Sequence, residues 1–260
     1  YYLRIFSDLS QVGLFELAVK FGAILSVLVW NPFSQWWQTE KFKIYHTENQ
    51  GKDIYPVVFN GLVCALALFA FGIAIFAGPV IEIKSSPQFH QAKVAVPILV
   101  YATFMSKIEM FLQLSFMLAE RNMIIAYVRY ASAIVMTILF LIFIPLWGFV
   151  GAALATLLTN IFVFCAYYIL SKRVFDLNIK LDLLAGLVIV SCAFLYVQYL
   201  ISIEITKFQN DIIIRLVSSF TMLAIVFLFI RRDPELNQLY EKAFKVIKKN
   251  LNKSQSQETH

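Results

Sequence analysis

Apolar residues dominate this chain and fall into about seven runs separated by short polar connections. The runs lie near residues 13–37, 56–81, 94–118, 123–144, 148–170, 182–202 and 211–230. Each run is close to the roughly 20 residues that a helix needs to cross a bilayer. Because hydrocarbon offers no water to the backbone, a crossing segment must satisfy its own hydrogen bonds as a helix. The pattern therefore predicts an all-α membrane protein, a bundle of about seven transmembrane helices.

Composition and charge support this prediction and add an orientation. Hydrophobic residues make up 60% of the chain, which leaves no room for a soluble domain. Lys and Arg concentrate on one side of the expected membrane by roughly three to one, because they fill alternate loops and the segment after residue 230. Positive loops stay in the cytoplasm, so we expect a multi-pass protein of the cell (cytoplasmic) membrane with residue 1 outside and the C-terminus inside. The net charge of +6 is then a topology signal, and no nucleic-acid partner is expected.

The chain divides into three expected parts. Residues 1–175 would form a bundle of about five transmembrane helices, and residues 176–230 would add two peripheral ones. In residues 231–260 apolar residues recur at three- and four-residue steps among lysines, which predicts an amphipathic helix on the cytoplasmic face of the lipid bilayer and then a disordered tail. The chain begins without Met, and its first ten residues resemble a connector, so we expect a fragment that lacks an N-terminal lobe.

Ionisable residues within the apolar runs are the main functional clues, since each costs roughly 2.5 to 3.5 kcal/mol at the centre of a crossing. In the first run Glu16 and Lys20 lie one turn apart and can pair. Pro32 removes a backbone hydrogen bond later in the same run, so we expect a kink or hinge there. The arc that carries Glu16 and Lys20 should face protein or water.

Lys107 and Arg129 are the residues that we expect to bind an anion. Lys107 lies near the middle of the third run, in a polar sector that includes Glu109 and Gln113, and Arg129 lies about two turns into the fourth run. An Arg fork and a Lys ammonium both suit phosphate or pyrophosphate. An alternative remains open, in which Lys107 pairs with Glu109, or Arg129 with Glu120, and the charges only neutralise one another.

Small residues mark the start of the fifth run and predict close helix packing. They are Gly148, Gly151, Ala152 and Ala155. As an alternative, Thr156, Thr159 and Asn160 would line a cavity. The three His lie in loops or in the tail and the three Cys lie within apolar runs, so we expect no metal, no cofactor and no catalytic residues.

Two stretches of the chain resemble a known family. Residues 12–22 (VGLFELAVKFG) and 32–37 (PFSQWW) are similar to a pattern of polysaccharide flippases, and residues 144–156 (IPLWGFVGAALAT) resemble a later one. These flippases are the Wzx-type O-antigen and capsule transporters of the multidrug/oligosaccharidyl-lipid/polysaccharide exporter superfamily. The matching positions are Glu16, Lys20, Pro32 and Gln35. Where family members often carry an aspartate and an arginine close together, only Arg4 is present.

The resemblance implies about fourteen helices in two bundles around a cationic cavity, of which this chain would be the C-terminal lobe. It also implies the function, which is to translocate a polyprenyl-pyrophosphate-linked oligosaccharide for polysaccharide or lipopolysaccharide biosynthesis. We expect alternating access, with no bond made or broken. Two other functions remain open: a cation-coupled drug or small-solute exporter of the same superfamily, which would rely on Glu16 and Glu109, and a membrane-embedded glycan polymerase or ligase.

Overall fold

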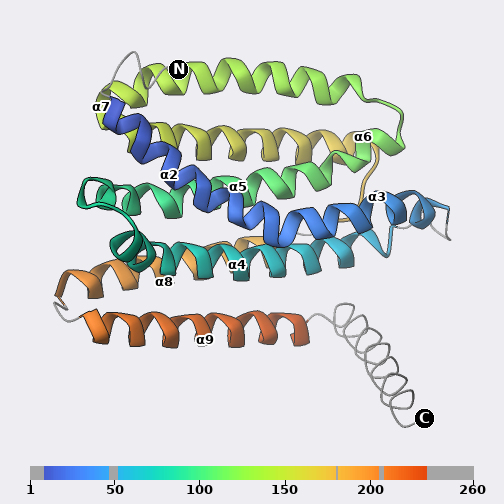
Figure 1. Ribbon diagram of the computed structural model, residues 1–260. Helices are drawn as coiled ribbons and strands as arrows, with labels where there is room; N and C mark the ends of the chain where they lie inside the picture. The colour runs from blue at the N-terminus through green and yellow to red at the C-terminus, as the bar shows by residue number, and fades with distance from the viewer. Residues whose placement is uncertain (1–8, 47–51, 180, 205–207, 233–260) are drawn as a thin grey trace, which may run out of the picture.

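The computed structural model describes residues 9–46, 52–179, 181–204 and 208–232, and their secondary structure is helical without any strand (Figure 1). The order is α2 (Leu9–Leu25), the π-helical turn η1 (Ser26–Trp30), α3 (Asn31–Tyr45), α4 (Tyr55–Lys84), the 3₁₀ helix η3 (Pro87–Val94), α5 (Ala95–Leu112), α6 (Leu114–Leu118), α7 (Met123–Val174), α8 (Asp182–Glu204) and α9 (Phe208–Arg232).

Four helical stretches in the described part of the chain are long and apolar enough to cross a membrane. They are Ser10–Tyr45, Tyr55–Lys84, Pro87–Leu118 and Met123–Val174. Two shorter apolar helical stretches follow, Asp182–Gln198 and Arg215–Leu228. An all-α protein with several apolar helices, compatible with a membrane, is thus confirmed. The count of seven crossings stays a prediction.

Helix α7 contains a chain reversal at Gly148. Its 52 residues would extend about 78 Å as one straight helix, far beyond the roughly 30 Å hydrocarbon core. Gly148 instead has φ 56° and ψ −131°, and Figure 1 shows α7 doubling back on itself. The helix therefore consists of two arms, 123–147 and 149–174, each about 38 Å long. This reversal lies in the connection that the sequence places between the fourth and fifth runs.

Contacts at the reversal explain why glycine is needed there. A Cβ built on Gly148 would lie 2.6 Å from Gln11 Oε1, and a Cβ on Gly151 would lie 2.0 Å from the carbonyl oxygen of Phe143. The backbone N–H of Phe149 donates to Gln11 Oε1 at 3.0 Å and so gains a partner at the start of the second arm. The reversal is thereby fastened to α2.

The expected kink at Pro32 takes the form of a π-helical turn just before it. Pro32 lies in the first turn of α3, where a missing N–H is tolerated. The N–H of Asn31 donates to the carbonyl of Ser26, five residues earlier, so the backbone stays helical through the junction. Figure 1 shows α2 running obliquely across α5 and α3 continuing in a different direction. The helix bends without breaking.

Helix α5 lies at the centre of the bundle. It packs against both α2 and α4 and has its most extensive interface with α7 (Figure 1). Gly22 allows α2 to approach closely, because a Cβ there would lie 2.6 Å from Thr103 Oγ1 and 3.3 Å from the carbonyl of Leu99. The side chains of α5 are therefore the ones best placed to act within the bundle.

Helices α8 and α9 pack mainly against α4 and against each other, at the edge of the bundle (Figure 1). Arg215 on α9 donates to the carbonyl of Ile75 on α4, which ties the outermost helix to the core. No pattern in the sequence indicates this bond between α9 and α4. The predicted amphipathic helix and tail of residues 231–260 lie outside the described residues except for Arg231 and Arg232, which end α9. Arg4 also lies outside the described residues.

Candidate functional site

Lys107 lies on the central helix α5 and is half-buried. Its Nζ lies 5.8 Å from the centroid of the Trp30 ring, at the end of the π-helical turn. In the described residues no carboxylate oxygen lies within 4.0 Å of this ammonium. Lys107 therefore contacts an aromatic face and forms no ion pair in the described residues, although the Glu109 carboxylate still attracts it from a longer distance. Trp30 was not anticipated from the sequence, where it is one apolar residue among many.

Glu109 faces a different helix from Lys107. Residues two apart on an α-helix point about 200° apart, so these two side chains leave α5 on opposite sides. Glu109 is fully buried, and its Oε1 lies 2.8 Å from Nη2 of Arg129 on the first arm of α7. Glu109 therefore forms its ion pair with Arg129, and its interaction with Lys107 is a longer-range attraction.

Arg129 links a buried acid to the surface of the bundle. Its side chain remains 45% exposed although one nitrogen reaches Glu109. The guanidinium carbon lies 5.8 Å from the centroid of the Tyr167 ring on the second arm of α7. Tyr167 in turn donates its hydroxyl to the carbonyl of Ile125 at 3.3 Å. Arg129 thus bridges α5 and both arms of α7.

The two ion pairs left open by the sequence are both absent from the described residues, since Lys107 has no acidic partner and Arg129 pairs with Glu109 rather than Glu120. Glu120 is exposed in the turn before α7 and has φ 57°. One of the two candidate anion ligands is consequently neutralised by an internal carboxylate. The other, Lys107, is not.

Glu16 and Lys20 are both exposed on α2 and form no ion pair with each other in the described structure. Their charges project from the same helix that packs against α5 through Gly22. Gln35 on α3 is also exposed, whereas Gln113 is half-buried at the junction of α5 and α6. The structure thus leaves Glu16, Lys20 and Gln35 exposed and Lys107 more buried.

Aromatic side chains surround the end of the bundle beyond Lys107. The Phe33 ring lies 5.8 Å from Trp30 and stacks on Trp37, which stacks in turn on Phe111 of α5 at 4.9 Å between centroids. Trp36, beside them, is 49% exposed. Such rings add packing energy of about 0.5 to 1.5 kcal/mol per pair beyond burial. The cluster fixes α3 against α5 and holds Trp30 beneath the Lys107 ammonium.

The small-residue seam of the second α7 arm is buried, at Gly151, Ala152 and Ala155. Its two threonines donate to carbonyls of their own helix, four residues back. Asn160 donates to the carbonyl of Ala102 on α5 at 2.8 Å. Asn160 therefore holds α7 to α5, whereas the two threonine hydroxyls find their partners within α7.

No group of three or more His, Cys, Asp or Glu in the described part of the chain could hold a metal ion. Comparisons with protein-family models, with curated proteins and with solved structures found no match. The contacts described above define the candidate site. It consists of Lys107 with Trp30, and of the Glu109–Arg129 pair on another face of α5.

Proposed function

We propose that this chain is the C-terminal lobe of a Wzx-type polysaccharide flippase. Together with a second lobe it would carry a polyprenyl-pyrophosphate-linked oligosaccharide across the cytoplasmic membrane by alternating access. The motif resemblance in residues 12–37 and 144–156 supports the family. One structural observation supports the chemistry: Lys107 is half-buried and forms no ion pair among the described residues.

The energetics of Lys107 favour an anionic ligand. A cation at the centre of a crossing costs roughly 2.5 to 3.5 kcal/mol. A cation–π contact returns about 0.5 to 2 kcal/mol, and the 5.8 Å separation from Trp30 is near the outer limit for such a contact. The remaining cost would be offset when a pyrophosphate group binds the ammonium. Anion binding thus accounts for an ammonium group at this depth in the bundle.

Arg129 has a secondary role in this proposal. Its guanidinium carries five N–H donors, of which the Glu109 carboxylate engages part, and its partial exposure leaves donors for a phosphate oxygen. Binding there must compete with a fixed internal anion. Lys107 is therefore the primary ligand, while Glu16, Lys20 and Gln35 are exposed on the first crossing where sugars of the substrate would pass.

The proposal includes seven crossings, with the two arms of α7 as separate spans. Residue 1 would then lie outside and the C-terminus in the cytoplasm, as the distribution of Lys and Arg indicates. The exposed apolar side chains along the first α7 arm would face lipid or the second lobe. The polyprenyl tail of the substrate would stay in lipid while its headgroup crosses.

A cation-coupled exporter is the second candidate function. It would need a carboxylate able to take up a proton or an organic cation. Glu109 is already opposed by Arg129 at 2.8 Å, which weighs against it, and Glu16 remains as an exposed acid on α2. Transport of organic cations by the purified full-length protein would favour this function. Newly joined sugar units among the products would instead favour a glycan polymerase or ligase.

The test is glycan export in cells that depend on the full-length protein. Lys107→Gln should reduce export at least tenfold while the protein remains in the membrane, and Lys107→Arg should restore part of it. Lys84→Gln is the matched control, because it removes one Lys charge in the same way from an exposed position at the end of α4. Normal export by Lys107→Gln would reject the proposal.

A further inference from the structure

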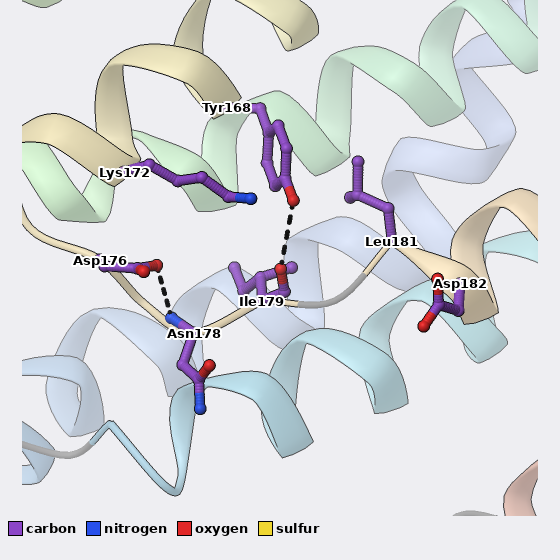
Figure 2. A pocket seen from close by; sticks show the side chains of 7 residues that line it. All are labelled: Tyr168, Lys172, Asp176, Asn178, Ile179, Leu181 and Asp182. Atoms are coloured by element: carbon purple, nitrogen blue, oxygen red, sulfur yellow. Dashed lines mark hydrogen bonds between the residues drawn. The ribbon is translucent and has the colours of Figure 1, made fainter.

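A polar cavity of about 330 Å³ lies where α7 ends and α8 begins (Figure 2). It has no part in the transport proposed above. The side chains of Tyr168 and Lys172 on α7 line it, and those of Asp176 and Asp182 reach it from the loop and from the first turn of α8. Its volume is at the lower end of the range for small-molecule sites, which suits a compact group rather than an oligosaccharide.

The cavity contains separated charges of both signs. Lys172 Nζ lies 4.4 Å from the centroid of the Tyr168 ring, and Figure 2 shows the ammonium pointing into the cavity. Neither Asp176 nor Asp182 forms an ion pair within the described residues, and Asp176 attracts Lys172 from a longer distance. A free cation would be repelled by Lys172, and a free anion would meet two carboxylates. A ligand that carries a positive and a negative group matches this lining.

Backbone contacts hold the lining in place. The Tyr168 hydroxyl lies 3.5 Å from the carbonyl oxygen of Ile179, and the N–H of Asn178 donates to Asp176 Oδ1 at 2.9 Å (Figure 2). Asn178 has φ 55°, a conformation that Asn tolerates better than most residues. The second oxygen of Asp176 is not engaged by this turn. It can accept a further hydrogen bond from a ligand.

The position of the cavity indicates the source of its ligand. Lys172 lies in the last turn of a long apolar helix and Asp182 in the first turn of the next apolar helix. This is the depth at which lipid headgroups meet a membrane protein, and where Tyr and Lys are enriched. A membrane lipid is therefore the molecule most abundant at the opening.

We propose that this cavity binds the headgroup of a lipid that carries a primary ammonium and a phosphate, as in phosphatidylethanolamine. The phosphate contacts Lys172, and the ammonium donates to the second oxygen of Asp176, while Asp182 on the other side of the cavity adds a longer-range attraction. A primary ammonium has three N–H donors for a carboxylate acceptor, whereas a trimethylammonium has none. Quaternary ammonium groups are bound instead by cages of several aromatic rings, and here the one ring in the lining is occupied by Lys172.

Lipid retention by the purified full-length protein tests this. The protein is placed in bilayers that contain equal amounts of phosphatidylethanolamine, phosphatidylcholine and phosphatidylglycerol, and the lipids that remain bound after extraction are measured by native mass spectrometry. We expect phosphatidylethanolamine to be enriched about five- to tenfold over phosphatidylcholine, as one or two charge-assisted hydrogen bonds would give. Equal retention of the two, or preference for phosphatidylglycerol, would overturn the proposal without any variant.

Variants of the lining residues test whether the preference for phosphatidylethanolamine arises at this cavity. The double variant Asp176→Asn/Asp182→Asn and the single variant Lys172→Gln should each abolish the enrichment. Glu120→Gln is the control, because it removes one exposed carboxylate from the turn before α7, another connection at the same end of the bundle. Soluble phosphoethanolamine, added in excess, should displace little lipid, since it lacks acyl chains. Enrichment that persists in both cavity variants, or full displacement by the soluble compound, would contradict the assignment.

Discussion

The contribution of the Glu109–Arg129 ion pair to the stability of the protein can be tested with a double-mutant cycle. Replacing Arg129 with Met keeps the length of the side chain but leaves Glu109 as a fully buried carboxylate without its cation. Adding Glu109→Gln to that variant removes the orphaned charge. We expect Arg129→Met to destabilise the protein and the second substitution to restore part of the loss.

The exposures of the two partners set the magnitude. Removal of one partner from a fully buried pair costs about 3 to 5 kcal/mol, whereas an exposed pair contributes about 0 to 1 kcal/mol. Glu109 is fully buried and Arg129 is 45% exposed, so Arg129→Met should cost about 2 to 3 kcal/mol. Glu109→Gln alone should cost about 1 kcal/mol, because the half-exposed Arg129 can turn to water.

The assay is unfolding of the full-length protein in detergent micelles, followed by circular dichroism. The double variant should be at least about 1 kcal/mol more stable than Arg129→Met alone, whereas additive effects would make it about 1 kcal/mol less stable. The coupling energy is therefore about 2 kcal/mol, well above the 0.3 to 0.5 kcal/mol of independent sites. Arg121→Met is the control, because it removes an exposed Arg that lies just before α7, the helix that carries Arg129. Purely additive effects, or an Arg129→Met variant as stable as the parent, would refute the reasoning.

Four further outcomes follow from the packing and from the ion pair. Gly148→Ala should lower the free energy of unfolding by about 1 to 3 kcal/mol, because the φ of 56° at this position strains any residue other than glycine. Gly61→Ala is the control and should be neutral or stabilising, because a Cβ at Gly61 on α4 meets open space. The unfolding midpoints of the two variants test this. Gly22→Val should push α2 from α5 and lower the midpoint, and an unchanged midpoint would contradict the close approach. Asn160→Leu should cost about 0.6 to 1.5 kcal/mol through loss of its bond to α5, measured in the same way. Glu109→Gln should raise the affinity for farnesyl pyrophosphate several-fold by releasing Arg129, and a fall in affinity would count against the proposed site.

Hydropathy predicted the helical class well, because an apolar run long enough to cross a bilayer must form a helix there to satisfy its backbone hydrogen bonds. The reversal at Gly148 was also accessible, since Pro145 and Gly148 interrupt the apolar pattern. The form of the bend at Pro32 was not. A π-helical turn depends on how α2 and α3 pack against α5, and residue type alone does not determine it.

The site was predicted only in part. Lys107 and Arg129 were identifiable as costly charges in apolar runs, but their partners depend on which helix lies on each side of α5. Lys107 and Glu109 are neighbours in sequence but contact different helices, so the pairing of Glu109 with Arg129 was not among the alternatives that the sequence offered. Trp30 contacts Lys107 from a segment 77 positions earlier (107 − 30), which no local pattern indicates.

Binding of a pyrophosphate lipid analogue tests the central claim most directly. Farnesyl pyrophosphate is titrated into the purified full-length protein and into its Lys107→Gln and Lys84→Gln variants, and affinity is measured by calorimetry in the same detergent. The account predicts about tenfold weaker binding for Lys107→Gln and no change for Lys84→Gln. Equal affinity in all three proteins would contradict a role for Lys107 as an anion ligand.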